Sequence, residues 1–277
     1  MRFLAASDAP APRVVVQGVP YDDGVSWRRG AASGPGAIRE ASDSIESWSP
    51  SQRRDLADIT LADAGDVALD GARGAEMVAR VAAATAAIAR TGALAVTLGG
   101  DHSISMGTSE GLRAVYADLA HVVLDAHLDM RADYEGDPYS HACGTRRMAS
   151  AGPTAALGIR SGSRDEFDDA ERMLIEWRDD LSLTDRVRAA IGGRPVFVSI
   201  DLDVLDPSVF PGTGNPEPGG ATYREVRDIV LALGGLRVVG IDLVECASTL
   251  DPTGVSPVVA AELAREGILA ALHDGSV

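Results

Sequence analysis

The chain has 277 residues, of which 45% are hydrophobic and 24% charged, the proportions of a globular protein that can bury a sizeable core. Its net charge of −16 argues against a nucleic-acid partner, because phosphate binding needs clustered cations. The charge would steer a cationic substrate or simply keep the protein soluble. With two cysteines there is no disulfide framework, and with no apolar segment suited to a signal peptide or membrane span we expect a cytoplasmic protein.

Short apolar runs alternate with helical patterns along the chain. The apolar runs predict strands over residues 13–19, 93–98, 121–124, 155–159, 196–200 and 237–241. The helical patterns cover residues 33–42, 74–90, 103–116, 164–177, 184–191, 223–233 and 257–271. This alternation is typical of βαβ units and predicts a mainly parallel sheet with helices on both faces.

The chain shows no internal repeat and no long linker, which favours a single domain over residues 1–277. The longest stretch of loop character is 207–220, with the sequence PSVFPGTGNPEPGG. Loops of this length in compact domains are often functional, so this segment is a candidate wall of a binding site.

Acidic residues and histidines follow four of the apolar runs. The four segments are GGDHS (99–103), DAHLD (125–129), DLD (201–203, closed by Asp206) and DLVE (242–245). Ligands of open parallel sheets collect beyond the carboxyl ends of the strands. In an extended backbone, residues i, i+2 and i+4 point to the same side, so Asp125, His127 and Asp129 should converge, as should Asp201 and Asp203.

Carboxylates in such a cluster repel one another and need a compensating charge. Counting His102, four carboxylates and two neutral imidazoles carry a formal charge of −4, which two divalent cations would balance. Oxygen-rich ligands with imidazole and no thiolate suit Mn²⁺, while Zn²⁺, Ni²⁺ and Co²⁺ stay open. The structural alternative is that each aspartate is a strand-end cap or a solvated loop residue.

Three of these strings resemble the metal-binding motifs of the ureohydrolases, the arginase and agmatinase family. They are GGDHS (99–103), DAHLD (125–129) and SIDLDVLDP (199–207). Segments similar to those of agmatinases extend the resemblance over nearly the whole chain: 18–42, 129–148, 157–161, 211–220 and 242–245. The resemblance implies a three-layer α/β/α fold, a mainly parallel sheet of about eight strands, and a homo-oligomer that is a trimer or hexamer.

The resemblance also implies a role for each residue. One Mn²⁺ would be held by His102, Asp125, Asp129 and Asp201, and the second by His127 and Asp203 with Asp125 and Asp201 as bridges. The metals would activate a water that attacks a guanidinium carbon and releases urea and an amine. Asp129 would pass a proton to the leaving amine, Glu245 would bind the guanidinium, and His141 would shuttle protons.

Agmatine, giving putrescine, is the first choice of substrate, because the segment around His141 and the 211–220 loop are similar to agmatinases and not to arginases. The sequence departs from the agmatinase pattern around His141, at Asn215 and after Glu245, near the expected pocket. Guanidinobutyrate, guanidinopropionate, arginine, guanidine and a formimino amino acid therefore stay open as substrates. The alternative to an enzyme is a non-catalytic homologue that binds metal for stability or serves as a partner subunit in a mixed oligomer.

Several residues also have a purely structural interpretation. His141 could cap the helix that begins near it, and Glu245 could pair with an arginine such as Arg160. Asp101 is expected to orient His102 or to stabilise its loop. The glycines at 99–100 are expected to allow a tight turn and a close approach of the backbone.

Overall fold

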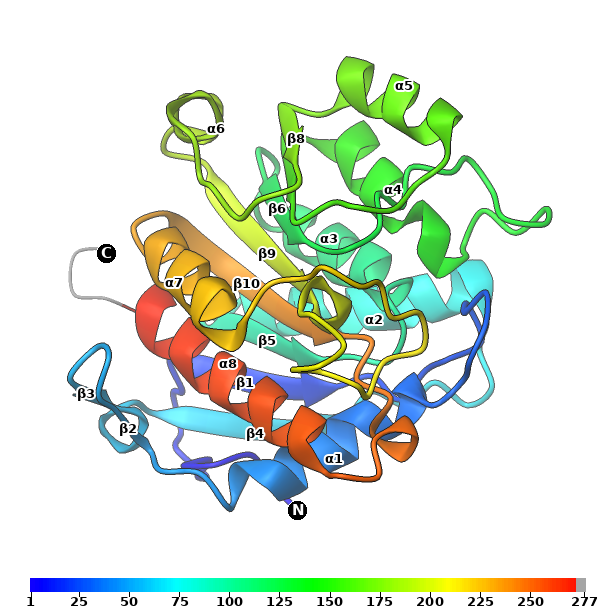
Figure 1. The fold of residues 1–277 in the computed structure, drawn as a ribbon. Helices are drawn as coiled ribbons and strands as arrows, with labels where there is room; N and C mark the ends of the chain where they lie inside the picture. The colour runs from blue at the N-terminus through cyan, green and yellow to red at the C-terminus, as the bar shows by residue number, and fades with distance from the viewer. Residues whose placement is uncertain (273–277) are drawn as a thin grey trace.

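The computed structural model describes residues 1–272 and contains an eight-stranded sheet between two layers of helices (Figure 1). The strands lie in the order β4-β1-β5-β10-β9-β6-β7-β8, and every neighbouring pair is parallel. Their bounds are β1 Val14–Gly18, β4 Leu61–Asp66, β5 Leu94–Leu98, β6 Ala120–Leu124, β7 Thr154–Leu157, β8 Glu176–Arg178, β9 Pro195–Asp201 and β10 Arg237–Val244. The predicted three-layer fold is confirmed.

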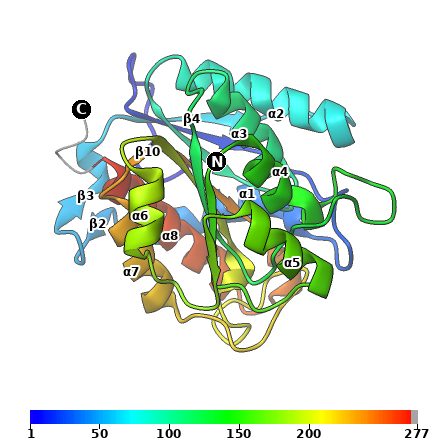
Figure 2. The ribbon, with the colours of Figure 1, turned by 90° about the horizontal axis from the view of Figure 1, so that it is seen from above.

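Helices cover both faces of the sheet (Figure 2). One layer holds α2 (Gly74–Ala89), α3 (Ile104–Arg113), α4 (Gly144–Ala151) and α5 (Arg164–Met173). The other holds α1 (Gly34–Ser42), α6 (Asp185–Ile191), α7 (Tyr223–Leu233) and α8 (Val255–Ala271), with α8 packed between α1 and α7. Every residue of β5, β6 and β9 is buried, which explains why these strands are continuous apolar runs in the sequence.

The helix predicted over 164–177 ends earlier than expected. The capping box of Ser163 and Glu166 starts α5, but the chain becomes extended at Leu174, and Trp177 lies in the edge strand β8. The Trp177 ring returns to α5 and packs against Phe167, with ring centroids 4.8 Å apart. The predicted carboxyl end of this helix was therefore wrong. Trp177 fits the apolar pattern of α5 because it packs on that helix, although it belongs to β8.

Three further strands, β2, β3 and β4, had no counterpart in the prediction. The strand β4 has the sequence LADAGD and buries only Leu61, so it lacks the apolar run that identifies the central strands. The two-residue strands β2 (Trp48–Ser49) and β3 (Arg54–Asp55) form a separate antiparallel pair. This pair is fastened to α8 by the Ser49 hydroxyl, which donates to Glu266 (2.8 Å). Across residues 1–272, no helix combines the length and apolarity that a membrane crossing requires.

The sheet order brings the four chemical segments together. The strands β5, β10, β9 and β6 are consecutive neighbours in the sheet, although β6 and β9 are separated in the chain by two other strands. The segments after β5 and β6 follow their strands directly, whereas those of β9 and β10 begin inside the last residues of the strand. All four segments therefore meet at the carboxyl edge of the sheet, where ligands of parallel sheets bind.

Candidate metal centre

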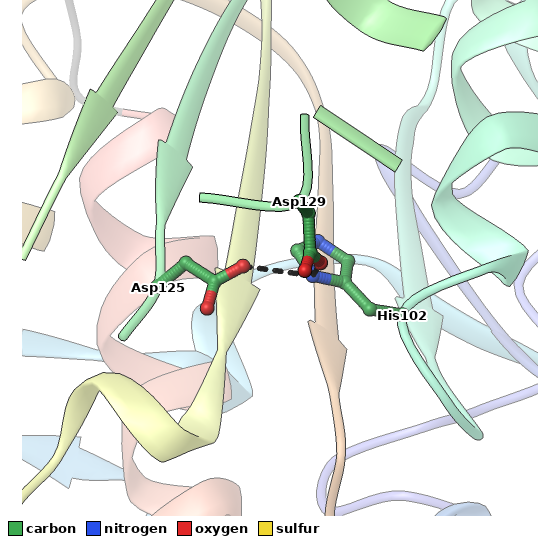
Figure 3. A group of neighbouring side chains, drawn as sticks. All are labelled: His102, Asp125 and Asp129. Atoms are coloured by element: carbon green, nitrogen blue, oxygen red, sulfur yellow. Dashed lines mark ion pairs between the residues drawn. The ribbon is translucent and has the colours of Figure 1, made fainter. Parts of the chain in front are cut away.

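The first group of candidate ligands surrounds one nitrogen of His102. Nδ1 of this buried imidazole lies 3.0 Å from Oδ2 of Asp125, and 3.2 Å from Oδ2 of both Asp129 and Asp201. Figure 3 shows His102 with Asp125 and Asp129, which reach it from the loop after β6. A single imidazole nitrogen cannot donate to three carboxylates at once, so a cation shared among them suits this arrangement better than hydrogen bonding does.

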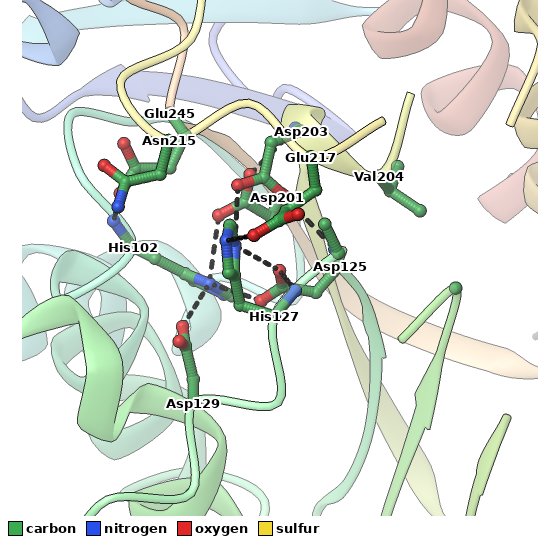
Figure 4. Close-up of polar contacts among 12 residues, drawn as sticks. His102, Asp125, His127, Asp129, Asp201, Asp203, Val204, Asn215, Glu217 and Glu245 are labelled. Atoms are coloured by element: carbon green, nitrogen blue, oxygen red, sulfur yellow. Dashed lines mark hydrogen bonds and ion pairs between the residues drawn. The ribbon is translucent and has the colours of Figure 1, made fainter. Parts of the chain in front are cut away.

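The second group surrounds His127. Its Nδ1 lies 2.9 Å from Oδ2 of Asp203 and 3.7 Å from Oδ1 of Asp125. Asp125 thus presents one oxygen to each group, which is the geometry of a bridging carboxylate (Figure 4). The other ring nitrogen of His127 faces Glu217 at 3.6 Å, on the side of the 207–220 loop.

The charges of the site fit two divalent cations. Nδ1 of His102 and Oδ2 of Asp125 are fully buried without a hydrogen-bond partner. Burial lowers the pKa of His102, but the three carboxylates outweigh it and raise the pKa well above its ordinary value. The pKa of His127 is raised in the same way, by Asp203 and Asp125. Burial and the neighbouring aspartates raise the pKa of Asp201. These raised pKa values show that the buried side chains favour the binding of protons, because among the described residues the site holds no other positive charge to balance its carboxylates.

The ligands converge by a different route from the one expected. Residues 125–129 are not an extended strand: the N–H of His127 donates to Oδ1 of Asp125 (2.6 Å), and Asp129 has a φ of 51°. Asp203 lies in a single 3₁₀ turn, with its N–H donating to Oδ1 of Asp201 (2.9 Å). The expected alternation along an extended chain was wrong, and tight turns after each strand bring these side chains together. A left-handed aspartate costs about 1 kcal/mol or more, and such strain gathers at functional sites.

A buried chain of hydrogen bonds lies behind His102. Nε2 of His102 contacts the hydroxyl of Ser199 (3.0 Å), which donates to Oδ1 of Asp242 (2.7 Å). The hydroxyl of Ser105 donates to the other oxygen of Asp242 (2.6 Å). This arrangement places the imidazole proton on Nε2 and leaves Nδ1 free to bind a metal. Neither Ser199 nor Asp242 had a predicted role; the signal that could have identified Ser199 is a serine inside the apolar strand β9.

Glu245 and His141 form a second polar unit beside the ligands. Oε1 of Glu245 accepts from the N–H of His102 and from Nδ1 of His141, both at 2.9 Å, and Oε2 is left for another donor. Glu245 is buried and has a φ of 63°. The structural alternatives do not hold: the α4 cap has no side-chain bond, and Arg160 donates to backbone carbonyls instead of to Glu245.

The loop before His102 is shaped by Asp101, as expected from one of the structural interpretations. Asp101 accepts from the N–H groups of Gly24 (2.8 Å) and Ser103 (3.0 Å), so it fixes this loop to the amino-terminal segment. A Cβ on Gly100 would lie 1.8 Å from the carbonyl oxygen of Tyr21. A side chain at position 100 would therefore push the two segments apart.

A cavity of about 390 Å³ opens over these groups. Four of the six candidate ligands line its floor with His141, and its outer wall includes Arg131, Tyr134, Glu166, Asn215 and Glu217; the four are His127, Asp129, Asp201 and Asp203. Nη2 of Arg131 lies 3.3 Å from Oε2 of Glu166, which offsets the charge of that guanidinium. The cavity has room for a small linear molecule and is lined mainly by polar groups.

Known proteins resemble this chain over nearly its whole length. Residues 12–270 match the arginase family. Agmatinase from Bacillus anthracis is 38% identical over 263 residues, which cover 92% of this chain and 91% of that protein. The N(1)-aminopropylagmatine ureohydrolase of Thermococcus kodakarensis is 36% identical, covering 88% and 86%. The crystal structure of an agmatine ureohydrolase from Thermoplasma volcanium superposes with a TM-score of 0.85 at 32% identity, covering 97% and 93%. The chain therefore belongs to the arginase family and is a metal-dependent amidinohydrolase.

Proposed function

We propose that the protein hydrolyses agmatine to urea and putrescine with two Mn²⁺ bound by His102, Asp125, His127, Asp129, Asp201 and Asp203. The observation that carries the proposal is that the two ligand groups share Asp125 and that members of both line one cavity. Glu245 lies beside them, bound through one oxygen to His102 and to His141, which also lines that cavity. The agmatinase and aminopropylagmatine ureohydrolase among its relatives support a substrate with a guanidinium at one end and an amine at the other.

The side chains of this protein bind and orient the substrate. When bound, the two cations supply Lewis-acid activation of the attacking water. Oε2 of Glu245 accepts N–H groups of the guanidinium, which places the guanidinium carbon over the ligand groups. Asp129 holds the proton that water loses and passes it to the leaving nitrogen, while His141 exchanges protons between the cavity and the medium. Guanidinium and water thus become urea and a protonated amine, with atoms and charge in balance.

The outer wall favours an amine over a carboxylate at the far end of the substrate. This wall holds two carboxylates, Glu166 and Glu217, and one guanidinium, that of Arg131. Arg131 is already paired with Glu166, so a second positive charge on the substrate meets a net negative wall. Arg131 is nevertheless the feature that favours the second candidate, a guanidino acid such as guanidinobutyrate.

A urea-release assay over a substrate panel tests the proposal. The purified chain, assayed with Mn²⁺ and then with Ni²⁺, should show a kcat/KM for agmatine at least about 10-fold above that for guanidinobutyrate, guanidinopropionate or arginine. Preference for a guanidino acid would replace agmatine with the second candidate. No turnover of any guanidino compound, with two metals bound per chain, would contradict the catalytic function itself.

The proposal extends to the whole protein. We infer that residues 1–277 form one catalytic domain that acts in the cytoplasm as a trimer or hexamer. The support is the family to which the chain belongs and the continuity of the sheet across it. Light scattering of the metal-loaded protein measures the oligomer, and a monomer would contradict that part of the proposal.

A further inference from the structure

His141 is held from both sides of its ring. Nδ1 contacts Oε1 of Glu245 at 2.9 Å. On the opposite side, the main-chain N–H of Ser26 donates to Nε2 at 3.0 Å, and the Ser26 hydroxyl lies 2.9 Å from the same nitrogen. A main-chain N–H can only donate, so Nε2 carries a lone pair in this geometry and the ring proton lies on Nδ1.

The hydrogen bonds around this ring run in one direction. Nδ2 of Asn215 donates to the Ser26 hydroxyl (3.1 Å), which is then free to donate its own proton to His141. The His141 proton goes to the carboxylate of Glu245, which can only accept when ionised. Bonds that run in one direction polarise and strengthen one another. Asn215 is also one of the positions at which the sequence departs from the agmatinase pattern.

The segment that carries Ser26 is anchored at both ends. At its start, the N–H of Gly24 donates to Asp101 (2.8 Å). Two residues after Ser26, the Arg28 guanidinium donates to the carbonyl oxygens of Gly214 and Thr213, both at 3.0 Å. The segment is therefore fixed to the loop after β5 and to the loop that holds Asn215. These anchors keep the Ser26 N–H directed at the imidazole.

We propose that Ser26, supported by Asn215, is a positioning residue for His141. It fixes the ring so that a proton at Nδ1 faces Glu245 and a lone pair occupies Nε2. The catalytic consequence of this positioning rests on the proposed function. A ring in the opposite tautomer would present a lone pair to the Glu245 carboxylate, and the repulsion would displace Glu245 and weaken its binding of the guanidinium.

Kinetics of three variants test the consequence with agmatine as substrate. Ser26→Ala should lower kcat about 10-fold and leave KM within about twofold, because both hydrogen bonds of the hydroxyl are made to protein groups, Asn215 and His141. The acidic limb of the kcat profile should move about 0.5–1 pH unit upward, since one donor to the neutral ring is lost. Ser26→Thr should restore both values. The matched control is Ser33→Ala, whose hydroxyl donates to the Gly30 carbonyl oxygen and does not touch His141.

Imidazole nitrogen NMR tests the positioning without any substrate. The Zn²⁺-loaded protein is diamagnetic, and the His141 signal is identified by its loss in His141→Gln. At pH 10 the neutral ring should carry its proton on Nδ1 in the unmodified chain and in Ser26→Ala, Asn215→Leu and Ser33→Ala, because alanine at position 26 keeps the main-chain N–H. The Nε2 signal should shift downfield in Ser26→Ala and Asn215→Leu, which lose or weaken the hydroxyl donor to Nε2, and should stay unchanged in Ser33→Ala. An Nε2 proton in the unmodified chain, or an Nε2 signal and a pH profile that Ser26→Ala leaves unchanged, would overturn the proposal. A chain that shows the Nδ1 tautomer but releases no urea would contradict only the proposed function.

Discussion

The two oxygens of Asp125 face different histidines, so each imidazole should be needed for only one metal. Oδ2 lies near His102 and Oδ1 near His127. We expect His127→Ala to bind one metal per chain in place of two, because the His102 group stays complete. Turnover should fall by more than about 100-fold, since changes that only support a ligand already cost 10–100-fold. Elemental analysis of the dialysed protein measures the metal content.

His141→Ala is the matched control for this experiment. His141 lies beside the ligands but contacts Glu245 and Ser26 and is not one of the proposed six. This variant should keep two metals while losing turnover. Two metals retained by His127→Ala, or one metal lost by His141→Ala, would show that the ligands are assigned incorrectly.

His121 should make stability depend on pH far from the metal centre. It is fully buried, with ring nitrogens 2.8 Å from the Ser109 hydroxyl and 3.2 Å from the Thr154 hydroxyl. Burial, with a smaller effect of the Arg113 charge, lowers its pKa to about 3. Between that value and about 6.5 the unfolded chain binds more protons than the folded chain, so the stability present above pH 6.5 is lost as the pH falls.

This contribution is measurable by urea unfolding of the unmodified chain and of His121→Gln. Between pH 7.5 and 5, the free energy of unfolding of the unmodified chain should fall by about 2 kcal/mol more than that of the variant. All other carboxylates and histidines are shared by the two proteins, so their effects cancel in the difference. Parallel pH dependences would mean that His121 can be protonated inside the folded protein.

At the scale of elements, the guanidinium of Arg160 holds together two segments that carry site residues. It donates to the carbonyl oxygens of Asp203 and Glu217, both at 2.8 Å, and to that of Pro218 at 3.2 Å. The planar fork of arginine makes these bonds in fixed directions, which a lysine cannot reproduce. We expect Arg160→Lys to lower the unfolding temperature by about 5 °C, from a loss of about 2 kcal/mol.

Turnover of agmatine should fall in the same variant, because the 207–220 loop, which faces His127 through Glu217, loses its attachment to the turn after β9. Arg178→Met is the control: Arg178 pairs with Glu176 and Asp180 on the surface, where ion pairs contribute little. The unfolding temperature measured by calorimetry and the rate of urea release should both be close to those of the unmodified chain in this control. An Arg160→Lys variant equal to the unmodified chain in both assays would contradict a role for the fork.

The elements that could be predicted from the sequence are those whose burial is uniform. The central strands follow from continuous apolar runs, whereas β4 buries one side chain and β8 has three half-buried residues at the edge of the sheet. The ligands could be identified because they lie close together in short motifs, although His102 needed the family resemblance. Ser26 and Asn215 could not, since 189 residues separate them and two loops must fold before they meet.

At the scale of the whole molecule, the net charge of −16 should act on the substrate before it reaches the cavity. Agmatine carries two positive charges at neutral pH, and guanidinobutyrate carries one of each sign. Attraction over distances beyond the pocket is screened at high salt, because the Debye length falls from tens of ångströms to a few. Raising NaCl from 20 to 500 mM should therefore lower kcat/KM for agmatine by about threefold to tenfold, and that for guanidinobutyrate by less than about twofold. Metal content is measured at both salt concentrations, so that loss of Mn²⁺ is not mistaken for screening. Equal salt dependence for the two substrates would show that the charge of this protein serves its solubility and does not steer its substrate.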